Sequence, residues 1–490
     1  MEKKKTYPSL SNLVEMGFSR GMVRDAYGNH SNLVENLREH SSKYFIDIDT
    51  LESPKIKKKS RYVITTAVTG QEACLKTVKS IESYCKKNDA EFLVLIAKGT
   101  DKVGQSLDKN LQNANIIIDD INLNNNVKLL TLLMNATKGD PTSGGITRIG
   151  KRDSSVILAS SKQRLQYSAT GIDKMPHAAM GTGSITKPNY PKKTVSGYVA
   201  QHDHVMGGIV VEVVDDELFH FRQIQFKDGR FVDLGVEYDG SKTKKVSGAL
   251  VLGDWHSGST CPVVAESSLS MSKQLGIKEW VMHDVFDGRS ISHHNEGKLI
   301  LKGVFAAQGK LSLNDELNGL KRDLEYIKMK IPKITIVRSN HDEHLSRYLD
   351  EGRFVTDPHN FRVGIHLATK LLSGDNPVEV GVEVDGINWL KRDQSYLVHG
   401  IECGAHGDKG ANGSRGSAAS LEKAYGDCVY GHSHSPNILR GAWCVGTSTL
   451  PFPDYGDGPT SWMNTHCIIY PGGFRQLVNC IEGKFFLAQK

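Results

Sequence analysis

Five short stretches in the second half of the chain combine carboxylate, amide and imidazole side chains. They are Leu252-Gly-Asp254-Trp-His256, His283-Asp284-Val-Phe-Asp287, Ser339-Asn340-His341-Asp342, Leu397-Val-His399-Gly400 and Tyr430-Gly-His432-Ser-His434. These groups are ligands for Mn, Fe and Zn. Metal ions held by such groups serve phosphate chemistry, because they polarise the phosphoryl group and activate water. The residue types therefore predict a metal site for phosphate chemistry.

The elements that must position these side chains are expected from about residue 246 onward. Apolar runs typical of strands occur at 249–252, 280–282, 334–337, 396–398, 428–430, 443–445 and 467–470. Helical spacing appears at 264–275, 313–329 and 361–372. In such α/β folds, ligands gather at the carboxyl ends of the strands. We therefore expect the polar motifs to meet at one edge of a sheet.

In this order, the five motifs resemble those of the calcineurin-like metallophosphoesterase family: Asp-x-His, Gly-Asp-x-x-Asp, Gly-Asn-His-Asp/Glu, a lone His and Gly-His-x-His. The sequence departs from that pattern at His283 and at Arg338-Ser339, where the family usually has glycine. The resemblance implies an α/β fold over residues 246–490, a four-layer β-sandwich flanked by helices.

The resemblance also implies the ligand set. Asp254, His256 and His434 would hold one ion, Asn340, His399 and His432 the other, and Asp284 would bridge them. Two divalent ions are expected, Mn²⁺ first, with Fe or Zn as alternatives. His406-Gly407 repeats His399-Gly400, so His406 is an alternative ligand, although His399 is favoured because it ends an apolar strand. Asp287 is expected to hold ligands in place by hydrogen bonding.

His341 follows a predicted ligand directly and is the candidate for protonating the departing alkoxide. Asp342 would orient or charge its ring. Three more imidazoles, His293, His294 and His344, lie near the motifs. A lone histidine is more often structural than a ligand, so their roles stay open.

Basic residues near the motifs are candidates for binding phosphate. Arg289 follows Asp287, and the glycine-rich stretch 404–417 carries Lys409 and Arg415. These side chains could hold a nucleic-acid backbone at the site. The alternative for the glycine-rich stretch is a mobile solvent loop.

Residues 1–60 are predicted to form a small helical segment followed by a basic linker. Its outline is that of a helix-turn-helix, with Ser19 as N-cap of the second helix. Arg20 and Arg24 would lie on the exposed face that such motifs present to DNA. The alternative is a helical hairpin that packs on the body or joins subunits.

Residues 61–245 are predicted to form an α/β domain with a β-rich end. Strand-like runs at 62–68 and 92–97 enclose helical spacing at 71–87, which indicates a β-α-β unit. Further strands are expected at 115–119 and 155–159. An irregular stretch is expected at 180–193, and antiparallel strands over 195–238.

Length and composition limit the protein class. A chain of 490 residues and 54.0 kDa predicts two or three domains. No apolar run approaches the ~20 residues needed to cross a membrane, and the first residues show no secretory signal. The eight cysteines are dispersed, which favours reduced thiols in a cytoplasmic protein. The net charge of +6 permits binding to a polyanion.

The predicted function is a metal-dependent phosphodiesterase that hydrolyses DNA. The whole-chain layout, including the stretches 283–294 and 404–417, resembles the pre-early DNA-transfer proteins of T5-like tailed phages. That resemblance implies host DNA degradation, DNA transfer and the host cytoplasm. A homo-oligomer and other phage or host proteins are further hypotheses for partners. The alternatives are a small-molecule phosphatase or cyclic-nucleotide phosphodiesterase, and a non-catalytic scaffold on the same fold.

Overall fold

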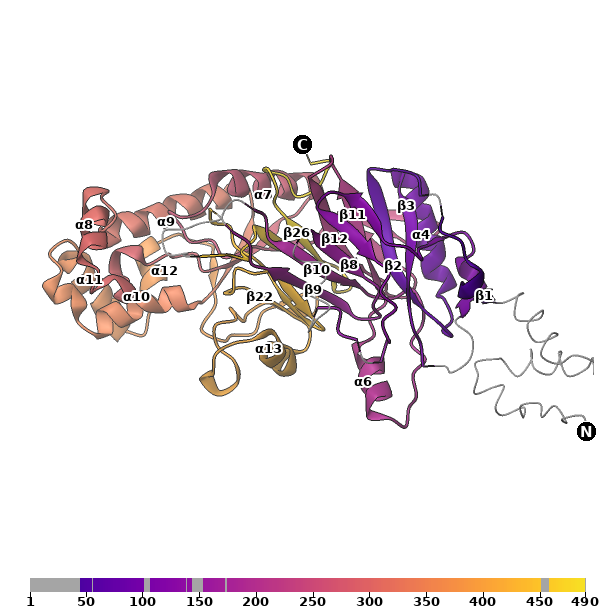
Figure 1. Ribbon diagram of the computed structural model, residues 1–490. Coiled ribbons are helices and arrows are strands. Elements are labelled where there is room, and N and C mark those ends of the chain that lie inside the picture. Colours follow the sequence, from indigo (N-terminus) through magenta and orange to yellow (C-terminus); the bar gives the residue numbers. More distant parts are fainter. Residues whose placement is uncertain are drawn as a thin grey trace, which may run out of the picture. The chain divides into compact units, whose positions relative to one another are not determined.

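The computed structural model describes residues 45–54, 56–100, 106–137, 139–142, 153–171, 174–450 and 458–489 (Figure 1). These residues belong to two compact units. The first comprises the described residues up to Leu165 together with Ala178–Lys244, and the second comprises those of Gln166–His177 and from Lys245 onward. The domain boundary predicted from the sequence lies between residues 245 and 246. The predicted helix-turn-helix, with Arg20 and Arg24, lies outside the described residues.

The first unit contains a five-stranded sheet with the order β12-β11-β2-β3-β5. Its strands are β2 (Arg61–Val68), β3 (Glu91–Ala97), β5 (Asn115–Ile116), β11 (Gly207–Val213) and β12 (Phe219–Gln225). β2, β3 and β5 are parallel, and α4 (Leu75–Asn88) connects β2 to β3. The predicted β-α-β unit is therefore present. Val78, Ile81 and Tyr84 of α4 are buried in the core beside this sheet.

Two expectations for the first unit are wrong in part, although residues 183–193 lie outside every helix and strand and β11 pairs antiparallel with β12, as predicted. Residues 180–182 belong to β10 (His177–Thr182), which pairs in parallel with β8 (Ser155–Leu158). β10 consists mainly of small residues, and a Cβ on Gly181 would lie 2.6 Å from the Lys162 carbonyl, so close packing replaces the usual β-branched composition. The second error is α6 (Val195–Asp203), a helix within the stretch expected to be β-structure, capped by the Thr194 hydroxyl.

The remaining elements up to the end of the first unit are short. They are β1 (Phe45–Asp47), β4 (Ser106–Asp108), β6 (Ile121–Asn124), β7 (Val127–Leu130), β9 (Gln163–Ser168), β13 (Phe231–Asp233), β14 (Val236–Tyr238) and β15 (Thr243–Lys245). β6 pairs with β7, and β7 pairs in parallel with β8.

A six-stranded sheet of order β19-β18-β17-β16-β25-β26 runs through the second unit. Its strands are β16 (Ala249–Val251), β17 (Glu279–His283), β18 (Lys333–Val337), β19 (Asn388–Trp389), β25 (Thr465–Tyr470) and β26 (Phe474–Asn479). β16 to β19 are parallel, whereas β25 is antiparallel to β16. The carboxyl ends of the parallel strands therefore share one edge.

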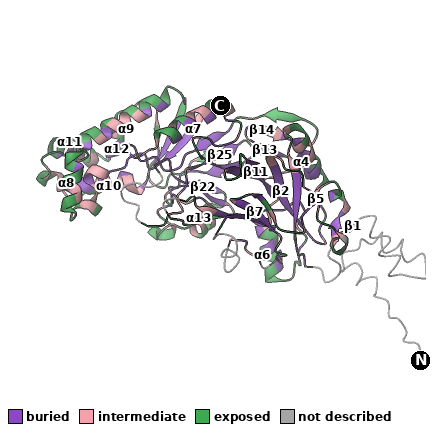
Figure 2. Ribbon diagram, turned by 45° about the horizontal axis from the view of Figure 1, so that its top comes forward, coloured by how far each residue is buried: buried purple, intermediate pink, exposed green. Residues whose placement is uncertain are grey.

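Helices make the crossovers between these parallel strands (Figure 1). They are α7 (Pro262–Leu275), α8 (Leu299–Ala307), α9 (Leu313–Lys328), α10 (Asn340–Asp350), α11 (Phe361–Leu372) and α12 (Pro377–Val382). Most of α8 and much of α11 are exposed (Figure 2). In the described part of the chain, no helix combines the length and apolar character that crossing a membrane requires.

Strands after residue 396 form a further sheet region in the second unit. In order they are β20 (Leu397–Val398), β21 (Ile401–Glu402), β22 (Cys428–Tyr430), β24 (Ala442–Cys444) and β23 (Asn437–Leu439), with α13 (Ala418–Tyr425) before β22. The protein is thus a mixed α/β fold with several sheets. The four-layer sandwich of the metallophosphoesterases stays a prediction.

Candidate metal centre

Loops that leave the strands of the second unit bring seven polar residues into one group, which we call the main cluster. They are Asp254 and His256 after β16, Asp284 after β17, Asn340 after β18, His406 after β21, and His432 and His434 after β22. The His434 Nε2 atom lies 3.1 Å from Asp254 Oδ2, and His406 Nε2 lies 3.1 Å from Asp284 Oδ2. Side chains from distant parts of the sequence therefore converge.

Asp284 belongs to both halves of the main cluster. One half combines it with Asp254, His256 and His434, and the other with His406 and His432, with candidate ligand atoms in each half within 4.8 Å of one another. Asn340 Oδ1 lies 3.1 Å from His406 Nε2 and so adjoins the second half. This arrangement places Asp284 where a carboxylate bridging two ions would be.

The backbone holds the first two ligand loops together. The His256 amide donates to the Asp284 carbonyl at 2.7 Å, and the Trp255 amide donates to the His283 carbonyl at 3.0 Å. His256, Asp284, His432 and His434 all have positive φ, between 45° and 72°. Non-glycine residues adopt this conformation uncommonly, and such strain concentrates at functional sites.

Gly431 allows β22 to approach Asp254 closely. A Cβ at this position would lie 2.2 Å from Asp254 Oδ1. The next amide, that of His432, donates to Asp254 Oδ2 at 2.8 Å. Only glycine leaves room for this contact, which explains the Gly-His-x-His spacing in structural terms.

The main cluster fits divalent cations. Asp254 Oδ1 and Asp284 Oδ1 are buried, and neither has a hydrogen-bond partner in the part of the chain that the structure describes. A buried carboxylate is costly unless a cation compensates it. A set of carboxylate, amide and imidazole donors suits first-row transition metals. The residues present could therefore hold the two predicted ions.

Electrostatics keep the carboxylates of the main cluster ionised. Burial alone would raise the pKa of Asp284, but the charges of His406, His341 and His256 hold that pKa well below its ordinary value. Burial likewise opposes charge on His406, yet Asp284 raises the pKa of His406 to about 9. Without metal, protons on imidazole supply part of the positive charge that the carboxylates require.

His399 does not join the main cluster, and His406 occupies the place predicted for it. His399 and Gly400 form an exposed two-residue turn between β20 and β21, because Val398 pairs with Ile401. Both turn residues have positive φ, 51° and 84°, as in a type I′ hairpin. His406 is 3% exposed and lies between Asn340 and Asp284.

Asp287 lies where it can orient a ligand. Its Oδ1 atom is 3.3 Å from His256 Nδ1, and its Oδ2 atom is 3.2 Å from the Arg289 guanidinium. Burial would raise the pKa of Asp287, but the hydrogen bond and charge of His256 lower it to about 2. An ionised Asp287 therefore fixes the His256 ring with Nε2 directed to the main cluster.

His341 lies beside the main cluster in the first turn of α10. Its Nδ1 atom is 2.7 Å from the Asp287 carbonyl oxygen, so Nδ1 is the donor in this hydrogen bond and Nε2 is left for chemistry. Its ring centroid is 4.5 Å from that of His256. Burial would lower the pKa of His341, but Asp284 and Asp287 raise it. The ring is thus suited to carry a proton.

Asp342 does not orient His341, contrary to the sequence prediction. Its Oδ2 atom accepts a hydrogen bond from the Ser339 amide at 3.0 Å, and the Asp342 amide donates to the Ser339 hydroxyl at 3.4 Å. These two bonds form a capping box that starts α10. Burial, followed by the charge of Asp284, raises the pKa of Asp342 to about 6.

The predicted phosphate-binding residues have different surroundings. Lys409 Nζ lies 3.2 Å from Glu343 Oε2, and Arg415 is exposed. Arg289 pairs with Asp287 and also lines a cavity of about 490 Å³. Asn340 and His341 line the same cavity, so it adjoins the main cluster.

One supporting histidine was not identified from the sequence. His466 on β25 is fully buried, and its Nδ1 atom accepts a hydrogen bond from the Gly253 amide at 2.9 Å. Its Nε2 atom lies 2.9 Å from the Ser268 hydroxyl. His466 thereby fixes the loop that carries Asp254. A continuous buried strand gives no periodicity that would have distinguished it.

Comparison with known proteins indicates a phage source for the chain. No protein-family model matches it, and no solved structure matches it. Protein A1 of Escherichia phage T5 is 28% identical to it over 478 residues, which cover 89% of this chain and 84% of that protein. The similarity over most of both chains suggests a phage protein of the A1 type.

Proposed function

We propose that the protein is a dinuclear-metal-dependent phosphodiesterase of the metallophosphoesterase type that hydrolyses DNA. The observation that carries this proposal is the main cluster, in which Asp284 is shared by two groups of candidate ligands and two buried carboxylate oxygens lack a partner among the described residues. The order of the five motifs and the similarity to a phage protein support it.

The ligands divide between two ions, which the chemistry of the donors favours as Mn²⁺. Asp254, His256 and His434 would hold one ion, Asn340, His406 and His432 the other, and Asp284 both. Bound ions supply Lewis acidity at the phosphoryl group and activate water for attack. The protein's own contribution is to fix the ligands, through Asp287 on His256 and through the paired loops after β16 and β17.

His341 would transfer a proton from Nε2 to the departing oxygen of the ester. His341 Nδ1 donates a hydrogen bond to the Asp287 carbonyl, which holds the ring in one orientation. The nearby carboxylates Asp284 and Asp287 favour the protonated ring. A sugar alkoxide is a poor leaving group, so a nucleic-acid phosphodiester needs this proton more than an activated ester does.

DNA is the proposed substrate because of the cavity beside the main cluster and the charge of the chain. Arg289 and Lys298 line this cavity together with Asn340 and His341, so cations border the place where a phosphodiester would enter. The net charge of +6 favours a polyanionic substrate. As a phage nuclease, the protein would act in degradation of host DNA and in DNA transfer, in the host cytoplasm.

The test is incubation of purified protein with supercoiled, linear and single-stranded DNA, each with EDTA and then with added Mn²⁺. A chromogenic small phosphodiester is assayed in parallel. We expect DNA cleavage that EDTA abolishes and Mn²⁺ restores. Hydrolysis of the small ester without DNA cleavage would indicate the small-molecule phosphodiesterase. The absence of both reactions at full metal occupancy would indicate a scaffold.

A further inference from the structure

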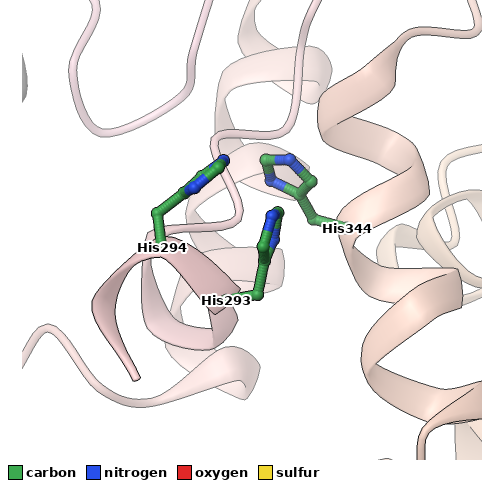
Figure 3. Close-up of side chains that lie close together, drawn as sticks. All are labelled: His293, His294 and His344. Atoms are coloured by element: carbon green, nitrogen blue, oxygen red, sulfur yellow. The ribbon is translucent and has the colours of Figure 1, made fainter. Parts of the chain in front are cut away.

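A second group of imidazoles lies outside the main cluster. His293 and His294 on η4 (His293–Asn295) face His344 on α10, and Figure 3 shows the three rings converging. The ring centroids of His293 and His294 are 3.8 Å apart, and those of His293 and His344 are 5.3 Å apart. One ring nitrogen of each residue lies within 4.8 Å of the other two. We call these residues the three-histidine cluster.

Two rings of the three-histidine cluster have unused buried nitrogens. His293 Nδ1 and His344 Nδ1 are buried, and neither has a hydrogen-bond partner in the described part of the chain. Neutral imidazole is the form that binds metal. Two unpartnered ring nitrogens that converge with a third imidazole, that of His294, therefore form an available ligand set.

We propose that the three-histidine cluster binds a third divalent cation, a zinc-type ion. Imidazole ligands suit Zn²⁺, whereas carboxylate ligands suit Mn²⁺, and this group contains imidazoles alone. Tetrahedral Zn²⁺ with ligands at about 2.0–2.1 Å places its ligand atoms about 3.3 Å apart. Nitrogens already within 4.8 Å reach this spacing by small rotations of the side chains.

The fourth coordination position would face the cavity beside the main cluster. His294 and His344 both line that cavity, together with Asn340 and His341. The rings of His344 and His341 have centroids 4.7 Å apart. An ion with three protein ligands keeps one position for water or an oxygen of a bound phosphate. The inference itself does not rest on the proposed function, because it concerns zinc binding in the absence of substrate.

The test measures Zn²⁺ binding by calorimetry and by metal analysis, without DNA. The key variant is His294→Ala, because His294 is exposed and its loss leaves the core unchanged. His366→Ala, on the exposed face of α11, is the matched control. Both are compared in the full-length protein and in a second background, Asp254→Asn with Asp284→Asn, which removes the carboxylates of the main cluster.

We expect about one equivalent of Zn²⁺ to remain bound in the second background. His294→Ala should weaken the binding of this ion by at least about 100-fold, since even groups that only orient a ligand are worth 10–100-fold in metal affinity. His366→Ala should change nothing. Equal zinc affinity and stoichiometry in the two variants would overturn the proposal, and so would complete loss of zinc in a folded second background. If that background does not fold, crystals soaked in Zn²⁺ decide: an anomalous peak between the three rings supports the site, and its absence overturns it.

Discussion

Each unit of the protein contains a buried group of charged residues, and the two groups are neutralised in different ways. In the first unit, the Arg222 guanidinium contacts Glu212 at 3.0 Å and Asp233 at 2.8 Å. Arg61 adds a second cation 2.6 Å from Glu212, and the Tyr84 hydroxyl donates to Asp233 at 2.8 Å. In the second unit, the main cluster surrounds Asp254 and Asp284 with imidazoles.

This difference separates a structural charge group from a candidate metal site. Guanidinium groups are always charged, so the first unit carries its own compensation for Glu212 and Asp233. The cations beside Asp254 and Asp284 are imidazoles, whose charge depends on pH, and one oxygen of each carboxylate is unpartnered among the described residues. The second group could therefore hold an external cation.

The largest effect is expected from Asp284→Asn. Loss of the shared carboxylate should empty both metal positions. Because metal ions stabilise the transition state of phosphoryl transfer by several kcal/mol, DNA cleavage should fall by about 10³-fold or more. Metal analysis and a DNA cleavage assay check this, with the exposed Asp385→Asn as control. Two bound ions and parental cleavage in Asp284→Asn would contradict the assignment of this residue.

Arg222→Met tests the other half of the comparison. It leaves Glu212 and Asp233 without their main cation, which should cost about 3–5 kcal/mol in the unfolding free energy of the first unit. Hydrogen exchange of the β2 and β11 amides measures this loss, while metal content should be unchanged. Arg230→Met, in a surface ion pair, should cost no more than about 1 kcal/mol. Equal exchange rates in the two variants would show that the buried network does not stabilise the unit.

His341→Ala distinguishes a role of His341 in proton transfer from a role in metal binding. DNA cleavage should fall by about 10²–10⁴-fold, the usual worth of general acid catalysis. A nitrophenyl phosphodiester should be hydrolysed comparatively well, because its leaving group needs no proton, and both ions should stay bound. Equal losses on both substrates would instead indicate that His341 positions the phosphate, and loss of an ion would make it a ligand.

Asp287→Asn should give a smaller effect on the same site. The variant keeps the size of the side chain but loses the charge that holds His256. Groups that orient a ligand are typically worth 10–100-fold in metal affinity, so Mn²⁺ binding should weaken by that factor. Calorimetric titration measures it against Asp385→Asn. Unaltered affinity would mean that the loop backbone alone fixes His256.

The smallest effect concerns pH and two histidines, the half-buried His204 of the first unit and the buried His466 of the second. Burial lowers the pKa of His204 to about 4 and that of His466 to about 3, against about 6.5 in the unfolded chain. The unfolded state therefore binds more protons below pH 6.5, and stability should fall as pH decreases from there towards the folded pKa values. Each imidazole contributes about 1.4 kcal/mol per pH unit at most.

Denaturation at pH 7 and pH 5 measures this pH effect. All five tryptophans lie in the second unit, so their fluorescence reports on His466. Hydrogen exchange of β11 reports on His204. His466→Gln should reduce the pH dependence of the fluorescence transition and leave exchange in the first unit unchanged. A pH dependence that persists in full would assign it to other groups.

The strands that carry ligands could be predicted from the sequence, because each is an apolar run followed directly by a polar residue. β16, β17, β18 and β22 lie within one residue of their predicted bounds. The β-α-β unit of the first unit could be predicted from the spacing of apolar residues, which differs between strands (a period of 2 residues) and helices (a period of 3.6 residues). α6 could not be predicted in this way, since it has little apolar periodicity and depends on its Thr194 cap.

Two structural features decide whether His399 or His406 is the candidate ligand: a turn at His399 and a contact of His406 with a distant part of the chain. The sequence Val398-His-Gly-Ile401 carries a hairpin signal, because two short apolar runs flank a residue pair ending in glycine. His406 is fixed instead by the Gly431 amide, which donates to its carbonyl at 2.8 Å. A local pattern cannot reveal that second contact. By contrast, Ser339-x-x-Asp342 is a readable capping signature, which indicates the structural role of Asp342.

The order of the candidate ligands along the chain would make metal binding by the main cluster a reporter of association between two fragments. Gly374 is an exposed residue between α11 and α12. A chain divided there would carry Asp254, Asp284 and Asn340 on one fragment, and His406 and His434 on the other. β25 of the second fragment pairs with β16 of the first, so each fragment also lacks half of the sheet. Recovery of metal binding on mixing would therefore report complementation of the two fragments.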